Sequence, residues 1–169
     1  SEMCIRDRIR GEIRKLDRLC SSVHHMYHGK FNEIIPNHAV IITISPSVTH
    51  IADQAFYNKK NLRHVKIVNS SQELKYIGVG CFRACYGLEF IQLPTHTICI
   101  EANAFDSCYN LKNIDMPTSM KCVESSTFEN CGSLPSELVI PPNIISIEKF
   151  AFRNCCTIRN VNISSPIIN

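Results

Sequence analysis

The sequence has 169 residues, of which 44 % are hydrophobic, and this is enough for one ordinary domain with its own core. It contains no run of about 18 apolar residues, so we expect no segment of it to span a membrane. The formal net charge of +3 is small and no block of Lys or Arg occurs, which argues against a nucleic-acid partner.

The first eight residues, SEMCIRDR, stand apart from the rest of the chain. Reverse translation allows the codons TCG GAG ATG TGT ATA AGA GAC AGR, and this string resembles a transposon-end adapter from short-read sequencing libraries, translated in frame. We therefore predict that residues 1–8 are not native and exclude them from reasoning about the fold. The native N-terminus is then expected to be missing, and the lack of a signal peptide says nothing about localisation.

Residues 9–38 precede the regular part of the chain and are predicted to form a helical cap or a linker. Their apolar side chains recur at helical spacing, with charges between them: Ile9, Ile13, Leu16, Cys20, Val23 and Tyr27. This pattern is typical of an amphipathic helix, which could cover the open end of a stacked fold. A linker, or the remnant of an upstream domain, is the alternative.

Three histidines lie in the same segment. His24 and His28 are four residues apart, so on a helix they would share a face and could bind a metal ion, with His25 beside them. There is no H-E-x-x-H pattern to support such a site. We therefore favour a solvated helix end, and we expect no metal or other cofactor.

One pattern recurs through residues 39–169 with a period near 23. Each copy centres on a phenylalanine, at spacings of 26, 23, 23 and 24 residues: Phe56, Phe82, Phe105, Phe128 and Phe152. Three residues later comes Lys59 in the first copy and a cysteine in the others: Cys85, Cys108, Cys131 and Cys155. An alternating apolar pair then follows in every copy: Val65/Ile67, Ile91/Leu93, Ile114/Met116, Leu138/Ile140 and Val161/Ile163. Such self-similarity indicates a stack of equivalent coils.

A single coil of this length cannot bury its own apolar residues, so stacked coils must align equivalent positions in columns. The alternating pairs are typical of half-buried strands. Strands of successive coils would then form a parallel sheet with neighbours about 4.8 Å apart. A β-sandwich is the alternative, but it does not require a phenylalanine and a cysteine at a fixed position in every unit.

The pattern I-x-x-x-A-F-x-x-C-x-x-L-x-x-I-x-[IL]-P resembles the BspA-like subclass of leucine-rich repeats over about residues 40–163. The resemblance implies a mainly β repeat solenoid, with a curved parallel sheet on the concave side and short or helical turns on the convex side. We expect about five repeats, truncated in this chain. Three departures stand out: Lys59 in place of cysteine, about three extra residues within 68–81, and one extra residue near Pro135.

The cysteines fall into two groups by their place in the repeat. Those after the phenylalanines are predicted to be buried packing residues, and Cys81 is a small residue in the alanine column. Cys99 and Cys122 instead share a mixed column with His50, Tyr76 and Ser146. They lie in adjacent coils, so their Cα atoms should be about 5 Å apart, within the range of a disulfide. Two free thiols are the alternative, and the one we favour.

Residues between the buried positions of each strand face the concave surface. The candidate binding residues are therefore His64, Lys66, Phe90, Gln92, Asn113, Asp115, Glu137 and Val139. They contain no paired carboxylates at general-acid spacing, no Ser/His/Asp set and no basic stripe, so we predict neither an enzyme nor a nucleic-acid binder. Phe90, with polar neighbours, is the best candidate anchor for a protein partner, unless a neighbouring side chain partly covers it.

The resemblance implies a non-catalytic binding module that recognises a protein or glycoconjugate through its concave face, in a cell-surface recognition or adhesion role. The alternative is an intracellular, cytoplasmic scaffold for protein–protein interaction, with reduced cysteines. Two N-x-[S/T] sequons occur, at Asn69 and Asn162, and neither establishes secretion. The oligomeric state and the partner are left open.

Overall fold

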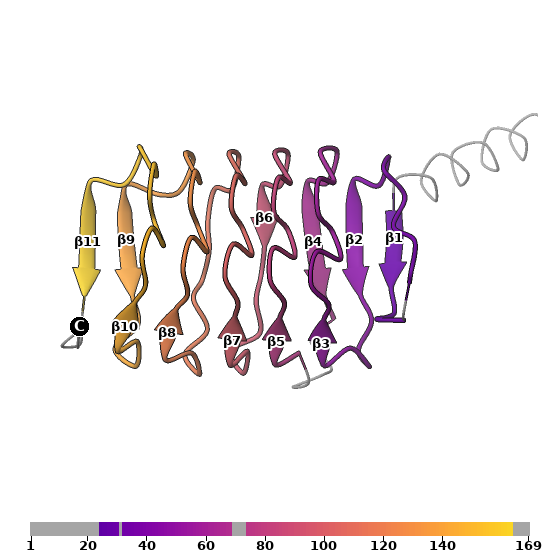
Figure 1. Ribbon diagram of the computed structural model, residues 1–169, viewed down its shortest axis with the longest axis horizontal. Coiled ribbons are helices and arrows are strands. Elements are labelled where there is room, and N and C mark those ends of the chain that lie inside the picture. Colours follow the sequence, from indigo (N-terminus) through magenta and orange to yellow (C-terminus); the bar gives the residue numbers. More distant parts are fainter. Residues whose placement is uncertain (1–23, 31, 69–73, 164–169) are drawn as a thin grey trace, which may run out of the picture.

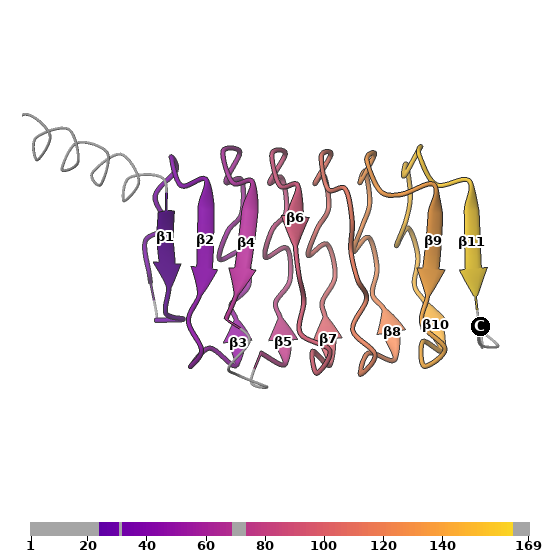
Figure 2. The ribbon, with the colours of Figure 1, turned by 180° about the vertical axis from the view of Figure 1, so that it is seen from behind.

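The computed structural model describes residues 24–30, 32–68 and 74–163, which wind into a parallel β-solenoid (Figure 1). Each complete coil contributes one strand to a narrow sheet and, except at Asn113, one strand to a broad sheet, and then turns around a phenylalanine into the next coil. Figure 2 shows the two rows of strands from behind, with the broad sheet in the upper row.

The broad sheet is built from the first strand of each coil. Its strands are β1 (His24–Tyr27), β2 (Ile41–Ile44), β4 (His64–Ile67) and β6 (Phe90–Ile91), in that order, and a separate pair, β9 (Glu137–Ile140) with β11 (Asn160–Ile163). The narrow sheet contains β3 (His50–Ile51), β5 (Tyr76–Ile77) and β7 (Cys99–Ile100), and a separate pair, β8 (Cys122–Val123) with β10 (Ser146–Ile147). All these strands pair in parallel, as the repeat predicted.

The alternating apolar pairs form strands because one side of each strand faces the core. The inner column of the broad sheet is buried in five coils: Ile42, Val65, Ile91, Ile114 and Leu138. Backbone pairing keeps equivalent residues in register, so that Ile41 pairs with His64 and His64 with Phe90. The predicted columns are therefore confirmed wherever strands pair.

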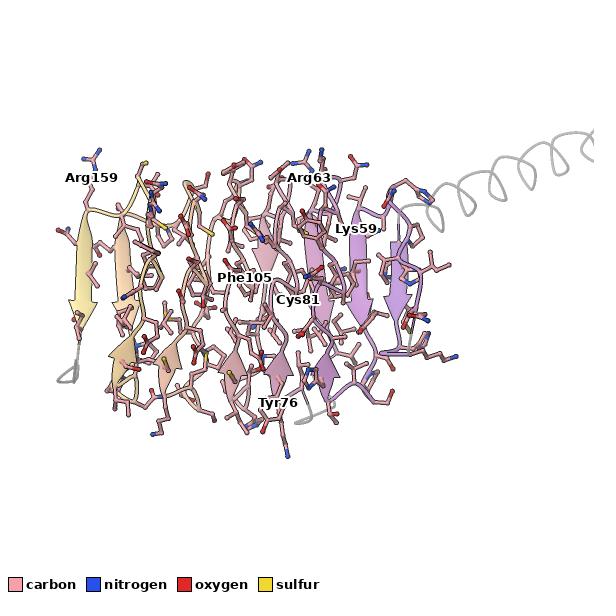
Figure 3. The ribbon with its side chains drawn as sticks, in the orientation of Figure 1. Lys59, Arg63, Tyr76, Cys81, Phe105 and Arg159 are labelled. Atoms are coloured by element: carbon pink, nitrogen blue, oxygen red, sulfur yellow. The ribbon has the colours of Figure 1, made fainter. Side chains whose placement is uncertain are left out.

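The phenylalanine column runs through the core as a continuous stack of rings. The side chains of Phe56, Phe82, Phe105 and Phe128 are fully buried, and Figure 3 places Phe105 inside the solenoid. Successive ring centroids, from Phe56 to Phe152, lie 5.0–5.5 Å apart with interplanar angles of 7–12°. This spacing is close to the distance between paired strands, so the rings stack without tilting the coils.

A backbone ladder accompanies the stacked rings. The amide of Phe82 donates to the Ala104 carbonyl at 2.8 Å, and Phe105 donates equivalently to Thr127 at 2.8 Å. The residues two before and two after each phenylalanine have positive φ: Gln54, Asn58, Gly80, Ala84, Asn103, Ser107, Ser126, Asn130, Phe150 and Asn154. We call the boundary between two successive coils a junction. With the phenylalanine amide, the amides of these flanking residues give three backbone bonds across each of the four junctions from Phe56 to Phe152. Four of these ten residues are Asn and one is Gly, the residue types that adopt the left-handed conformation most readily.

The cysteine column satisfies the carbonyls of the phenylalanine turn. The thiol of Cys108 donates to the Phe82 carbonyl at 3.2 Å, and equivalent bonds of 3.0–3.2 Å are made by Cys85, Cys131 and Cys155. Lys59 occupies the same place in the first copy, and its ammonium donates to the Ile35 carbonyl of the preceding coil at 2.7 Å. The substitution thus preserves a hydrogen bond to the coil before it.

The helix predicted within residues 9–38 is wrong over the part that the structure describes. Residues 24–27 form β1, which pairs with β2 over four residues, and Tyr27 packs edge-on against Phe56 with ring centroids 5.0 Å apart. Neither 28–30 nor 32–38 contains a helix, and no helical turn covers the solenoid in the described ranges. Residues 1–23 and Asn69 lie outside the described residues.

Both sheets are interrupted beside the coil that contains Lys112 and Asn113. In the broad sheet, the pairing stops at a single bridge between Phe90 and Asn113 and resumes only at β9. In the narrow sheet, β7 and β8 belong to separate groups of strands. The coils are therefore joined continuously along the phenylalanine turn but not along either sheet.

The buried stack predicts a clear difference between two phenylalanines of this chain. Phe105→Ala should lower the free energy of unfolding by about 3–5 kcal/mol, because it removes a fully buried ring from the middle of the column. Phe90→Ala is the matched control and should cost well under half as much, because the Phe90 side chain is 44 % exposed. Urea denaturation of both variants measures this, and equal losses would contradict the column.

The left-handed position at residue 150 predicts a stabilising substitution. Phe150 has φ of 62°, where a bulky residue is strained, and its side chain is 56 % exposed. Phe150→Asn should raise the free energy of unfolding by up to about 1 kcal/mol, because Asn tolerates this conformation better. The Arg153 guanidinium lies 5.1 Å from the Phe150 ring centroid and 3.6 Å from Glu129, so the control Arg153→Ala removes both contacts and sets an upper limit on the loss of the Phe150 contact. If Phe150→Asn lowers the thermal midpoint by more than the control does, the left-handed conformation of Phe150 is not strained.

The burial of the cysteine column predicts how the thiols react. Burial raises the pKa of Cys85 to about 12 and that of Cys155 to about 11, and also raises the pKa of Cys81, Cys108 and Cys131. At neutral pH these five thiols should be protonated and unreactive in the folded protein, whereas the exposed Cys156 should react with a thiol reagent at once. Mass spectrometry after a short labelling pulse distinguishes them, and early labelling of Cys108 would contradict the structure.

Candidate partner-binding face

The candidate residues all lie on the outward side of the broad-sheet row, which we call the broad face. His64 is half-buried. The other seven are exposed: Lys66, Phe90, Gln92, Asn113, Asp115, Glu137 and Val139. Backbone pairing places His64 beside Phe90 and Phe90 beside Asn113. The structure therefore brings the predicted residues together on one face, at neighbouring positions of successive coils.

Phe90 is flanked on the broad face by two side chains. The His64 ring stacks on it with centroids 5.7 Å apart and an interplanar angle of 6°. The Lys112 ammonium lies 5.3 Å from the Phe90 ring centroid, within the range of a cation–π contact. The ring is nevertheless 44 % exposed, so it is both held in place and open to a partner. We call His64, Phe90 and Lys112 the aromatic patch.

A row of alternating charges borders the aromatic patch. Glu89 accepts a 2.6 Å bond from the Lys112 ammonium and lies 3.4 Å from the Arg63 guanidinium. The hydrogen bond from Lys112 is the main reason that the pKa of Glu89 lies below its ordinary value. Figure 3 shows Arg63 and Arg159 on the same long edge of the solenoid. The pairing with Glu89 keeps Lys112 beside the Phe90 ring.

A groove opens where the broad sheet is interrupted, and we call it the seam groove. It has a volume of about 260 Å³ and lies between residues 113–116 and 135–141. Within the described residues no backbone hydrogen bond joins 112–116 to 136–140, whereas Lys112 still donates to Glu89 one coil earlier, at 3.1 Å. The extra residue near Pro135 lies at this interruption, and Pro135 itself lines the groove.

The seam groove has an acidic and partly apolar lining. Asp115 and Glu137 are exposed at its two sides, and Asp115 accepts a bond of 3.2 Å from the Asn113 amide. Val139 adds an apolar surface that is 61 % exposed. A further depression of about 470 Å³ continues from Val139 and Glu137 over β9 and β11. The groove is therefore suited to an extended segment with a positive charge.

The histidines at 24, 25 and 28 do not have the helical geometry that their spacing in the sequence suggested for a metal site. His24 lies in β1 rather than on a helix, and its Nε2 contacts the Thr43 hydroxyl at 2.7 Å. His25 lies next to it and contacts Glu33 at 3.4 Å. Among the described residues, no group of three or more His, Cys, Asp or Glu side chains could hold a metal ion. In that same part of the chain, no helix is long and apolar enough to cross a membrane.

The narrow face is the outward side of the narrow-sheet strands, and it repeats one feature of the broad face. His50 and Tyr76 are paired there, with ring centroids 5.7 Å apart and an interplanar angle of 30°. Cys99 pairs with Tyr76, and Cys122 pairs with Ser146. Both cysteines are free and half-buried. Tyr76 therefore offers an internal comparison for Phe90.

Sequence reasoning missed the charged row and the seam groove. The row occupies the position just before each strand, where Arg63, Glu89 and Lys112 alternate in sign, and this alternation is readable in the repeat alignment. The seam groove depends on backbone pairing, for which the extra residue near Pro135 was the one available signal.

Comparison with known proteins supports the repeat architecture. The chain matches a family described as a BspA type leucine rich repeat region with six copies, over residues 26–134 and 49–169. No curated protein matches the sequence.

Three solved structures are similar in fold. The Treponema pallidum leucine-rich repeat protein has a TM-score of 0.67 and 28 % identity, covering 72 % of this chain and 57 % of its own. A leucine-rich cell surface protein of Faecalibacterium prausnitzii A2-165 has a TM-score of 0.66 and 21 % identity, covering 87 % and 50 %. A leucine-rich repeat protein of Bacteroides ovatus ATCC 8483 has a TM-score of 0.61 and 21 % identity, covering 83 % and 45 %.

This chain spans about half the length of those three proteins. The two comparisons at 21 % identity show the fold alone, whereas the family match covers most of the sequence. Together with the recurring phenylalanine and cysteine columns, it shows that the chain belongs to the BspA type leucine-rich repeat family.

Proposed function

We propose that this chain is a non-catalytic binding module whose broad face recognises a protein or glycoconjugate partner. The observation that carries the proposal is the exposed Phe90 ring, held between His64 and Lys112 on the face that also contains the seam groove. An aromatic ring that is fixed by its neighbours loses little conformational entropy on binding, which is a property of binding hot spots.

The aromatic patch and the seam groove are expected to act together. Phe90 is bridged to Asn113, and Asn113 begins the lining of the groove, so the two features adjoin. A partner would place an apolar or sugar ring against Phe90 and a positively charged extended segment between Asp115 and Glu137. Binding of this kind rests on shape and charge complementarity and involves no bond chemistry.

We propose a cell-surface recognition or adhesion role for the module. Support comes from the similarity in fold to a structure described as a leucine-rich cell surface protein. The alternative is an intracellular scaffold, in which Cys99 and Cys122 would stay reduced, because disulfides are rare in a reducing compartment. Both roles would use the broad face, so the test of that face does not depend on the compartment.

The broad-face proposal predicts that Phe90→Ala raises the Kd for a partner at least about tenfold, as expected for a binding hot spot. The measurement screens the wild-type chain against arrayed surface proteins and glycans, and then determines Kd for each ligand with each variant. Tyr76→Ala is the matched control, because Tyr76 also stacks on a histidine at 5.7 Å but lies on the narrow face. Its Kd values should equal those of the wild type.

Two outcomes would count against the proposal. Ligands that lose affinity with Tyr76→Ala and keep it with Phe90→Ala would place binding on the narrow face. A partner that ignores both substitutions would place it elsewhere. Circular dichroism melts of both variants show that any loss of affinity does not come from unfolding.

A further inference from the structure

We propose that Cys99 and Cys122 form an inter-coil disulfide that closes the interruption in the narrow sheet. Neither the family match nor the proposed binding face implies this cross-link, which lies on the narrow face. Its success or failure is therefore independent of the broad-face proposal.

Strand pairing brings the two cysteines to the same position of adjacent coils. Cys99 pairs with Tyr76 in the coil before it, and Cys122 pairs with Ser146 in the coil after it. The two residues therefore continue one column, and Figure 1 shows β7 and β8 as neighbours in the lower row. The two thiols are close enough to interact electrostatically, since a charge on Cys122 raises the pKa of Cys99. β7 and β8 do not pair, but backbone bonds from Ser119 to Thr95 at 3.3 Å and from Asn103 to Ser125 at 3.0 Å join the same two coils on either side of them. The two cysteines are therefore held near the spacing of stacked coils, about 5 Å, which is within the Cα range of disulfides.

The two strands that carry these cysteines are not joined by a backbone ladder. At the preceding junction, Ile98 donates to the Lys75 carbonyl at 2.8 Å, and at the following one Ile145 donates to Lys121 at 2.8 Å. Within the described residues no backbone hydrogen bond joins 98–100 to 121–124. Disulfides require Cβ atoms closer than unadjusted parallel neighbours, so a junction without a ladder accommodates one at lower cost in strain.

These two thiols also differ from the structural cysteines of the chain. Cys85 and Cys108 are buried, and each donates to a phenylalanine carbonyl. Among the described residues the Cys99 thiol makes no hydrogen bond, and the Cys122 thiol contacts only polar side chains, those of Glu148 at 3.9 Å, Ser146 and Glu124. Both are half-buried rather than enclosed, so an oxidant can reach them. The column that follows the phenylalanines thus contributes to packing, whereas Cys99 and Cys122 are available for oxidation.

The reaction is a thiol–disulfide exchange with a small disulfide such as oxidised glutathione. One thiolate attacks the glutathione disulfide and releases one glutathione thiol, which leaves a mixed disulfide on the protein. The second thiolate then attacks that protein sulfur and releases the second glutathione thiol. Two protein S–H bonds and one glutathione S–S bond are exchanged for one protein S–S bond and two glutathione thiols.

Partial burial and nearby carboxylates govern the rate of this exchange. Burial is the main cause that raises the pKa of Cys99, and Glu101 and Glu124 add to it. The pKa of Cys122 is raised in the same way, mainly by burial. Because only the thiolate attacks, the rate should increase about tenfold per pH unit through neutral and mildly alkaline pH.

The experiment incubates the reduced, folded full chain with excess oxidised glutathione and maps the products by mass spectrometry. We expect the peptides that contain Cys99 and Cys122 to be joined, with two hydrogen atoms fewer than the separate peptides, while the exposed Cys156 takes up one glutathione. Cys99→Ser and Cys122→Ser should each instead carry one glutathione on the remaining thiol. Cys156→Ser is the control outside the pair and should form the bridge normally.

Two results would overturn the proposal. One is a wild-type chain that stays reduced, or that keeps one glutathione on each of the two thiols, at alkaline pH. The other is a bridge that joins either cysteine to a different partner, such as Cys156, in the folded protein. The bridge should also reduce the unfolding equilibrium constant at least about tenfold, because it constrains the unfolded chain.

Discussion

The phenylalanine turn is the constraint on which the rest of this structure depends. Its stacked rings fix the distance between coils, and its amides form the ladder that continues across the four junctions from Phe56 to Phe152. The thiol column closes the same turn by donating to the phenylalanine carbonyls of the preceding coil. Each sheet can therefore be interrupted at a junction of its own without separating the coils, because three backbone bonds and a stacked pair of rings still cross that junction.

The proposed function also depends on the phenylalanine turn, rather than the sheets, holding the coils together. Because the turn determines the spacing, the broad face can vary from coil to coil while equivalent positions stay aligned. Phe90, His64 and Lys112 meet there because one lies in each of three successive coils, not because they are near in sequence. The seam groove lies at the junction that contains the extra residue near Pro135, where the two neighbouring coils do not pair. The narrow-face interruption lies one junction earlier, directly across the solenoid from the Phe90–Asn113 bridge.

Periodicity allowed the coils, the buried columns and the positions on the broad face to be predicted from the sequence alone. Phe105, for example, recurs in phase because it stacks on an identical residue in each neighbouring coil, so the repeat itself predicts its environment. The N-terminal segment could not be predicted in this way. Tyr27 fits a helical apolar pattern equally well, and only its edge-on contact with Phe56 shows that it begins the aromatic column. The position of Lys112 over Phe90 depends on side-chain direction, and the seam groove on backbone pairing, neither of which the period specifies.

Native-state amide hydrogen exchange tests most directly whether the phenylalanine turn, rather than the sheets, joins the coils. The account predicts that the amides of Phe56, Phe82, Phe105 and Phe128 exchange slowly and at similar rates, because each donates to the next coil in the core. Amides at the two interruptions, such as those of Cys122 and Glu137, should exchange much faster. Strong protection at the interruptions together with rapid exchange in the turns would contradict it, because the sheets would then carry the stack.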